Sequence, residues 1–258
     1  MSTNVLLRVE SVSKHFGGIV ALDGVDLEAR SGEVTGLIGP NGSGKSTLFN
    51  VITGFLPPDS GQILFEGNRL NGLSPDSIAR LGLYRSFQSS LNPANMTVME
   101  NMLLCPQHQT GESILLSFLN PGQVRRQEKQ GQERAWHILE ELKLADKADT
   151  PVCDLSGGQK KLLSLAQALM AEPHLILLDE PVAGVNPRLI DDILEAVFRL
   201  KEQGQNFLIV EHNMQFVRQA CDRIAVLDAG QVLVSGPTLE TLEREEVLEA
   251  YLAAPRTE

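Results

Sequence analysis

Hydrophobic residues in this chain form short unbroken runs that alternate with stretches of helical spacing. The clearest runs are residues 34–38, 174–178, 207–210 and 224–227, where only Thr35 and His174 are polar. Runs of this length are typical of strands covered on both faces. Between them apolar residues recur every three or four positions, as expected for helices with one buried side. The alternation predicts an α/β domain with a mostly parallel sheet and helices on both of its faces.

The N-terminal part of the chain has a more interrupted pattern. Residues 5–27 predict short strands separated by turns at residues 17–18 and 23–24, because glycine and aspartate at these positions are typical of turns. Residues 61–70 predict a further β segment with a turn at residues 67–68. We expect these segments to form an antiparallel β subdomain.

The middle of the chain is predicted to be mostly helical. From about residue 75 to residue 150 the apolar spacing becomes helical, although residues 105–132 are rich in glutamine and glycine and poorly patterned. We interpret residues 87–154 as a helical subdomain inserted into a core made of residues 1–86 and 155–258. The whole chain then forms a single domain.

Charge and composition narrow the class of protein. The chain has 258 residues and a formal net charge of −11, which argues against generic nucleic-acid binding, since that depends on neutralising phosphates. Cys105, Cys153 and Cys221 lie far apart and lack the spacing of a metal site. The sequence has no signal-peptide pattern and no run near the ~20 apolar residues of a membrane helix. We expect a cytoplasmic protein that meets a membrane only through a partner.

Residues 39–46, Gly-Pro-Asn-Gly-Ser-Gly-Lys-Ser, match the pattern GxxxxGK[ST] between a predicted strand and a predicted helix. Three glycines allow successive backbone N–H groups to turn toward phosphate oxygens, and the helix N-terminus adds partial positive charge. Lys45 can reach the β- and γ-phosphates, and the Ser46 hydroxyl can bind Mg²⁺. A glycine-rich turn before a helix is the alternative, but the flanking elements favour a phosphate loop.

Asp179 and Glu180 follow a predicted buried strand. Ligands of open α/β sheets bind outside the carboxyl ends of the strands, so both carboxylates are expected beside the phosphate loop. Asp179 is predicted to help hold Mg²⁺ and Glu180 to orient or deprotonate the attacking water. Taken alone, such an acidic pair is more often a solvated turn.

A second candidate phosphate site is the sequence Leu-Ser-Gly-Gly-Gln at residues 155–159, directly before a helix expected to begin near Lys160. Ser156 and the N–H groups of Gly157 and Gly158 could bind an anion at this helix N-terminus. By itself the pentapeptide would be an ordinary capped helix start.

The phosphate loop, the acidic strand end and the LSGGQ sequence together resemble the ATPase subunit of ATP-binding-cassette (ABC) proteins over nearly the whole chain. The resemblance implies ATP and Mg²⁺ as ligands. It also implies a head-to-tail dimer in which the LSGGQ signature of one subunit completes the ATP site of the other. Gln88 is similar to the family's glutamine that senses Mg²⁺, His212 to the histidine that contacts the γ-phosphate, and Phe16 to the aromatic that stacks on adenine. Phe16 could equally be a core residue.

The implied ATP-binding residues are Phe16, Gly39, Pro40, Asn41, Gly42, Ser43, Gly44, Lys45, Ser46 and Thr47. The implied catalytic residues are Lys45, Gln88, Glu180 and His212, the implied metal ligands are Ser46, Gln88 and Asp179, and the implied signature contacts are Ser156, Gly157, Gly158 and Gln159.

One position departs from the general family pattern. The loop after Glu180 usually contains an aspartate, whereas this chain has Asn186 between Gly184 and Pro187. That loop is similar to the subfamily serving importers of branched-chain or other hydrophobic amino acids. Urea importers and lipopolysaccharide-export ATPases share much of the pattern, and a soluble ABC ATPase, such as one for iron–sulfur assembly, is a further alternative.

The transporter resemblance also implies partners and a location. The expected partners are integral membrane permease subunits, a second ATPase subunit that is identical or a sister chain, and, indirectly, an extracytoplasmic binding protein. No nucleic acid is expected. The expected location is the inner face of the cell membrane, as a peripheral cytoplasmic subunit.

Overall fold

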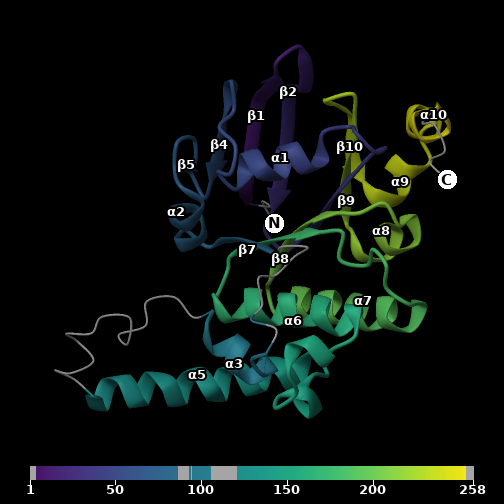
Figure 1. Cartoon of the computed structure of the whole chain (residues 1–258). Helices are drawn as coiled ribbons and strands as arrows, with labels where there is room; N and C mark the ends of the chain where they lie inside the picture. The colour runs from purple at the N-terminus through teal and green to yellow at the C-terminus, as the bar shows by residue number, and fades with distance from the viewer. Residues whose placement is uncertain (1–3, 87–92, 94, 106–120, 254–258) are drawn as a thin grey trace. The chain divides into compact units, whose positions relative to one another are not determined.

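The computed structural model describes residues 4–86, 93, 95–105 and 121–253. Its contacts divide the chain into two compact units (Figure 1). The first unit comprises Met1–Arg85, His174–Ala183 and Val197–Glu258, and the second comprises Ser86–Pro173 and Gly184–Ala196. The second unit thus takes in the LSGGQ sequence and the helix after it, which the predicted division had assigned to the core.

The first unit contains the antiparallel sheet expected for the N-terminal part. Its strands are β1 (Val5–Phe16), β2 (Ile19–Arg30), β4 (Ser60–Phe65) and β5 (Asn68–Arg69). They lie in the order β2-β1-β4-β5, and each neighbouring pair is antiparallel.

The predicted break at residues 23–24 is wrong, because β2 continues through it to Arg30. The pairing of β1 with β2 instead shifts register between Val12↔Val25 and Lys14↔Leu22, which is a β-bulge. Gly24 has φ +63° there, a conformation that favours glycine. A turn-like residue pair in a paired strand can therefore mark a bulge rather than an end.

The second sheet of this unit carries the predicted buried strands. Its members are β3 (Val34–Ile38), β6 (Leu83–Ser86), β7 (Leu175–Asp179), β8 (Asn206–Val210), β9 (Arg223–Asp228) and β10 (Gln231–Pro237). The order is β10-β9-β3-β8-β7-β6. Strand β3 is parallel to β8 and β9, β7 is parallel to β8, and β10 is antiparallel to β9. The mostly parallel sheet is as predicted.

Strand β6 was not predicted, since the sequence pattern indicated helices from residue 75 onward. Between residue 75 and β6, the helical residues are those of α2 (Pro75–Arg80), whose N-cap is Ser74. Four residues are too few to show a period-two pattern, so the placement of β6 at the sheet edge depends on tertiary pairing.

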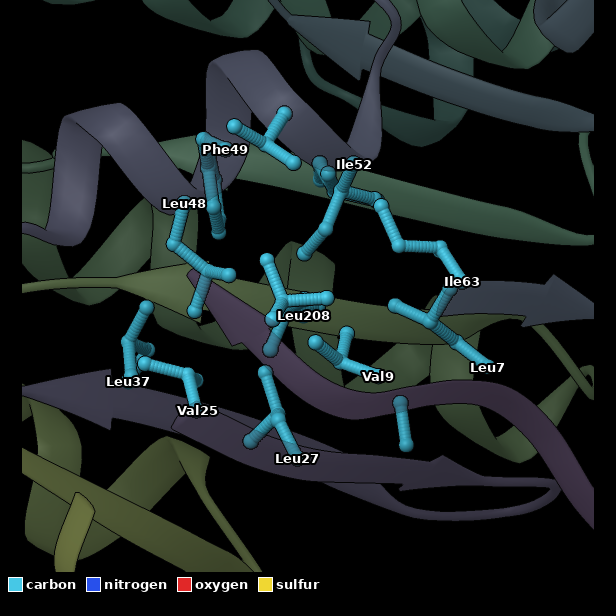
Figure 2. Close-up of a cluster of buried hydrophobic side chains, with 14 of the residues drawn as sticks. Leu7, Val9, Val25, Leu27, Leu37, Leu48, Phe49, Ile52, Ile63 and Leu208 are labelled. Carbon is cyan, nitrogen blue, oxygen red and sulfur yellow. The ribbon is translucent and has the colours of Figure 1, made fainter. Parts of the chain in front are cut away.

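Helix α1 (Lys45–Ile52) provides the centre of the hydrophobic core in the first unit. Its Leu48, Phe49 and Ile52 are fully buried and pack with Val9 of β1 and Leu208 of β8 (Figure 2). The same cluster includes residues of β2, β3 and β4. This packing holds the start of α1, and with it the loop before α1, against both sheets. The other helices of the first unit are α8 (Met214–Ala220), α9 (Thr238–Leu242) and α10 (Glu245–Ala253).

The second unit is helical in its described part, as predicted for the insertion. Its helices are α3 (Val98–Leu103), α5 (Pro121–Glu141), α6 (Gly157–Met170) and two short 3₁₀ helices at Ala145–Lys147 and Val152–Asp154. The helix α7 (Pro187–Glu202) begins in this unit, where Asn186 caps it by accepting a hydrogen bond from the Leu189 N–H at 3.1 Å. Asparagine followed by proline predicted this start.

Helix α5 begins within residues 105–132, the segment with a poor hydrophobic pattern. Its N-terminal half is rich in glutamine, arginine, lysine and glutamate, which favour helix but leave no apolar stripe to reveal it. Burial begins further along the helix, at Ala135, Ile138 and Leu139. Among the residues that the structure describes, none of the helices is long and apolar enough to cross a membrane.

Candidate nucleotide-binding site

Three parallel strands of the first unit end at the same edge of the sheet. β8 pairs with β3 on one side and β7 on the other. The chain leaves β3 into Gly39, β7 into Glu180 and β8 into Glu211. The predicted phosphate loop and the predicted acidic pair are therefore brought to one place, as expected from the rule that ligands bind beyond the carboxyl ends of parallel strands.

The loop between β3 and α1 has the backbone that a phosphate loop needs. Gly39, Gly42 and Gly44 have φ of 151°, 82° and 109°, which side-chain-bearing residues rarely adopt. A Cβ on Gly39 would overlap the carbonyl oxygen of Leu227, and one on Gly44 would overlap that of Ala21. Close approach to neighbouring backbone thus requires glycine at positions 39 and 44. At position 42 the backbone conformation alone favours glycine.

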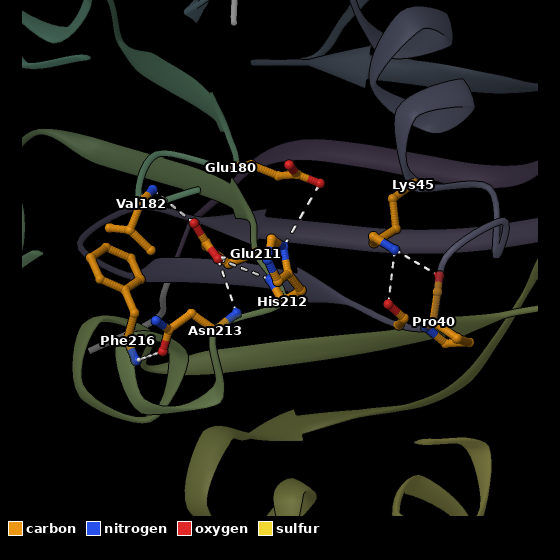
Figure 3. Close-up of polar contacts among 9 residues, drawn as sticks. Pro40, Lys45, Glu180, Val182, Glu211, His212, Asn213 and Phe216 are labelled. Carbon is orange, nitrogen blue, oxygen red and sulfur yellow. Dashed lines mark hydrogen bonds and ion pairs between the residues drawn. The ribbon is translucent and has the colours of Figure 1, made fainter. Parts of the chain in front are cut away.

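Lys45 lies inside this loop (Figure 3). Its ammonium donates hydrogen bonds to the carbonyl oxygens of Gly39 and Pro40, both at 2.8 Å. The side chain is buried, and this burial lowers the pKa of Lys45, while the charges of Glu180 and Asp179 act in the opposite direction. The ammonium is a buried cation facing two carboxylates, which is a suitable partner for a polyanion.

Glu180 follows directly after β7, with its backbone in the left-handed region at φ 49°. Its N–H donates to the carbonyl of Val210 at 2.9 Å, which ties this turn to the end of β8. The carboxylate Oε1 lies 3.8 Å from Nδ1 of His212 (Figure 3). His212 is 55% exposed, so its imidazole can reach a ligand above the sheet edge. The structure thus brings Lys45, Glu180 and His212 to one edge.

Glu211 is a structural part of this site that sequence reasoning did not assign. Its side chain is fully buried, and one carboxylate oxygen accepts from the N–H of Val182 at 2.9 Å. The other oxygen accepts from the N–H groups of His212 and Asn213 at 2.9 and 3.0 Å (Figure 3). Glu211 therefore joins the loop after Glu180 to the loop that carries His212. The sequence signal that could have indicated Glu211 is a charged residue directly after an unbroken apolar strand.

Arg85 of β6 is a second residue that the sequence did not single out. Its guanidinium donates to Oδ2 of Asp179 and to Oδ1 of Asn50, both at 2.6 Å. Both members of the Arg85–Asp179 pair are nearly buried. The predicted metal ligand Asp179 is therefore hydrogen-bonded to the guanidinium of Arg85.

Two of the predicted metal ligands supply the oxygen atoms that Mg²⁺ requires. Ser46 is exposed at the first turn of α1, and Asp179 supplies carboxylate oxygen at the end of β7. Mg²⁺ prefers such oxygen ligands and usually completes its shell with water and phosphate. Within the described residues, no group of three or more His, Cys, Asp or Glu could hold a metal ion. The third predicted ligand, Gln88, lies outside the described residues.

Phe16 stands at the end of β1 with 45% of its surface exposed. The interpretation of Phe16 as a core residue is therefore wrong. Lys14 places its ammonium 5.7 Å from the centre of the ring. An exposed aromatic face is compatible with stacking on a base, and that role stays a prediction.

The LSGGQ sequence opens α6 in the second unit. The helix begins at Gly157 rather than near Lys160, because Ser156 is its N-cap. The Ser156 hydroxyl oxygen accepts from the Gln159 N–H at 3.3 Å, and the Gln159 side chain accepts from the Ser156 N–H at 2.9 Å. Gly157 is open, whereas a Cβ on Gly158 would overlap the side chain of Leu189. Local packing thus requires glycine at position 158 and leaves room for a side chain at position 157.

The fold and the site together define a class of protein. A glycine loop with a buried lysine between a parallel strand and a helix, beside an acidic strand end, is the arrangement of a P-loop nucleotide-binding protein. The matching family model is that of the ABC transporter, over residues 22–183. The chain belongs to the ABC transporter family.

Relatives and solved structures agree with this assignment along the whole chain. A protein of Archaeoglobus fulgidus, named "Probable branched-chain amino acid transport ATP-binding protein LivG", is 41% identical over 98% of this chain and 97% of its own length. A protein of Escherichia coli K12, named "High-affinity branched-chain amino acid transport ATP-binding protein LivG", is 35% identical over 96% and 97%. A crystal structure of the ADP conformation of an ATP-binding cassette from an ABC transporter is 41% identical, with a TM-score of 0.84 over 97% of this chain and 99% of that one. These similarities confirm the predicted α/β fold.

Proposed function

We propose that this ATPase of the ABC transporter family powers an importer of branched-chain or other hydrophobic amino acids. The observation that carries the proposal is the convergence of Lys45, Glu180 and His212 at one sheet edge. The convergence occurs in a chain whose relatives, at 35–41% identity over nearly their full length, are named for branched-chain amino acid transport. The geometry supports the chemistry, and the relatives' names support the substrate class.

Binding of ATP begins with the phosphate loop. The backbone N–H groups of residues 39–46 and the N-terminus of α1 attract the phosphates. Lys45 exchanges its two carbonyl partners for β- and γ-phosphate oxygens, a stronger charge-assisted contact. Phe16 offers its exposed ring to adenine. Ser46, Asp179 and Gln88 would hold Mg²⁺, which when bound neutralises charge on the phosphate oxygens.

Hydrolysis then depends on Glu180 and His212. The Glu180 carboxylate orients the attacking water and accepts its proton, and the turn at the end of β7 directs it toward the sheet edge. His212 donates a hydrogen bond to the γ-phosphate and so compensates the charge that develops there. Glu211 fixes the backbone of His212 by accepting a hydrogen bond from its N–H.

A second ATPase subunit, identical or a sister chain, is proposed to complete each site. Ser156, Gly157, Gly158 and Gln159 would contact the nucleotide held by the opposite subunit. The Ser156 oxygen acts as an acceptor within the helix cap, so its O–H remains able to donate to a phosphate. Related cassettes, 25% identical to this chain, have been solved as dimers.

Permease subunits in the membrane, and indirectly an extracytoplasmic binding protein, complete the proposed transporter. The ATPase would then lie on the inner face of the cell membrane as a peripheral subunit. The helical part, residues 87–154, is proposed to contact the permeases.

The test is reconstitution of the transporter. The chain is co-expressed with candidate membrane permease subunits, purified and placed in proteoliposomes with an amino-acid-binding protein. We expect leucine-loaded binding protein to stimulate ATP hydrolysis several-fold, and Lys45→Ala to abolish hydrolysis while the complex still assembles. Stimulation by urea and not by leucine would contradict the substrate class. Failure to co-purify with any membrane subunit would favour a soluble ABC ATPase.

A further inference from the structure

Arg85 is held on three sides by groups of the first unit. One end of its guanidinium donates to Asp179 on β7 and the other donates to Asn50 on α1, each at 2.6 Å. The guanidinium carbon also lies 5.6 Å from the centre of the Phe49 ring, which is fully buried. The arginine guanidinium offers several nitrogen donors in one rigid plane that also stacks on an aromatic ring, and it is always charged. The position is therefore built for a fixed guanidinium.

The charges around this contact balance one another. Lys45 and Arg85 contribute two positive charges, and Asp179 and Glu180 contribute two negative charges. The Arg85–Asp179 pair is shielded from water, with the two side chains 12% and 10% exposed, so its attraction is only weakly screened. A divalent cation that approaches Asp179 from solvent meets a carboxylate already paired and two cations nearby.

We propose that Arg85 is the counter-ion of Asp179 and prevents this carboxylate from binding a divalent cation until a nucleotide is present. The inference rests on the proposed function in one respect, namely that Asp179 is a ligand of the nucleotide-bound Mg²⁺. ATP changes the balance because its phosphates bring several negative charges and engage Lys45. Arg85 donates to one carboxylate oxygen, Oδ2, so the other oxygen would be available to hold the metal. Arg85 is thus a positioning residue that makes metal binding conditional on nucleotide.

The experiment uses Mn²⁺ as a spectroscopic probe for the full-length protein. Binding of Mn²⁺ is measured by electron paramagnetic resonance, first without nucleotide and then with ATP. For the parent we expect weak binding without nucleotide and tight binding with ATP. For Arg85→Gln we expect nucleotide-free affinity to rise at least about tenfold, because a positive charge beside a divalent cation has been removed. Arg85→Met, whose unbranched stem keeps the packing on Phe49, gives the same test if the glutamine variant folds poorly.

Two control variants separate charge from shape. Arg85→Lys keeps the charge but loses the fork, so nucleotide-free affinity should stay near the parental value. Asn50→Ala removes one hydrogen bond of Arg85 but leaves the ion pair with Asp179 intact, so its affinity should also stay parental. A purely structural role for Arg85 would instead make lysine and glutamine equally disruptive and would leave the nucleotide-free affinity of both unchanged.

A third variant distinguishes this inference from the proposed function. Asp179→Asn should weaken Mn²⁺ binding in the presence of ATP and should cancel the gain when combined with Arg85→Gln. If Asp179→Asn is impaired but neither Arg85→Gln nor Arg85→Met binds Mn²⁺ more tightly than the parent, the counter-ion role is overturned and the metal assignment stands. If Asp179→Asn binds Mn²⁺ and ATP as the parent does, both the assignment and the inference fail.

Discussion

At the scale of single residues, Glu180 illustrates how a side chain is directed toward chemistry. It stands one residue beyond a buried strand, in left-handed backbone, 3.8 Å from the imidazole of His212. A non-glycine residue in this conformation stores a small strain, which the hydrogen bond to Val210 and the neighbouring strand hold in place. The arrangement separates the role of Glu180 from that of Asp179, whose carboxylate is hydrogen-bonded to Arg85.

Replacing Glu180 by glutamine tests its role as the base. Glutamine keeps the shape but cannot accept the proton of water, so hydrolysis should fall by a factor on the order of 10² or more. ATP binding should persist, and the loss of negative charge near the γ-phosphate should stabilise an ATP-bound dimer. Light scattering after gel filtration with Mg²⁺-ATP should show a doubled mass that reverts with ADP. The matched control, Glu240→Gln at an exposed position, should behave as the parent. Parental hydrolysis by Glu180→Gln would exclude Glu180 as the base.

The neighbours Glu211 and His212 separate stability from catalysis. Glu211→Gln places an amide against three backbone N–H groups that now meet a carboxylate, so the free energy of unfolding should fall by about 1–3 kcal/mol. His212→Ala removes an exposed side chain, so the free energy of unfolding should change by less than about 0.5 kcal/mol. The same substitution should strongly lower the rate of ATP hydrolysis. Urea denaturation and ATPase assays on both variants measure the difference. Equal effects on stability would show that Glu211 does not anchor the two loops.

At the scale of elements, the phosphate loop depends on how closely β3 approaches its neighbours. Gly36 lies in the middle of β3, and a Cβ there would meet Sγ of Cys221 at 2.9 Å and Cγ2 of Ile224 at 3.0 Å. Cys221 is buried at the end of α8, and burial, with smaller contributions from nearby carboxylates, raises its pKa to about 12. It acts here as a small packing group and not as a reactive thiol.

A double-mutant cycle tests this contact. Gly36→Ala should destabilise the protein by about 1–3 kcal/mol through overpacking. In a Cys221→Ala background the same substitution should cost about 1 kcal/mol less, because the nearest obstructing atom is gone. Thermal or urea unfolding of the two single variants and the double variant gives the coupling energy. Strict additivity would mean that β3 moves away to make room for the new methyl group.

At the scale of the whole molecule, the proposed head-to-tail dimer gives Ser156 a role on the opposite subunit's nucleotide. Ser156→Arg should leave ATP binding to the monomer nearly intact and abolish hydrolysis. Since Ser156 also caps α6, its loss costs roughly 1 kcal/mol of stability, which must be separated from the chemistry. Ser156→Asp keeps the cap and places a negative charge toward the partner's phosphates, so it should be stable and equally inactive. Loss of ATP affinity in the isolated monomer of either variant would indicate that the signature acts within its own chain.

Much of the fold and site was predictable because several signals are local. The strands of the parallel sheet appear as unbroken apolar runs, the phosphate loop appears as a glycine pattern between strand and helix, and the start of α7 appears as asparagine followed by proline. Where the local signal is weak the prediction failed, as for β6 and for the bulge at Gly24 in β2. The N-terminal half of α5 lies in the segment predicted to be helical, but its own pattern did not reveal the helix. The role of Gln88 rests on resemblance alone and stays a prediction.

The amino-acid sequence alone was enough to predict the class of fold, the position of Lys45 in its loop and the acidic end of β7. Each depends on neighbours within one turn of helix or one strand, where backbone sterics and solvation act on adjacent residues. Tertiary structure decided the partners of those residues. Arg85 meets Asp179 across 94 positions in sequence, and Glu211 meets Val182 across 29. Both contacts join buried charges to groups on different strands or loops. No local pattern encodes such a contact, because the charge is stabilised only after the sheet has brought its partner within hydrogen-bonding distance.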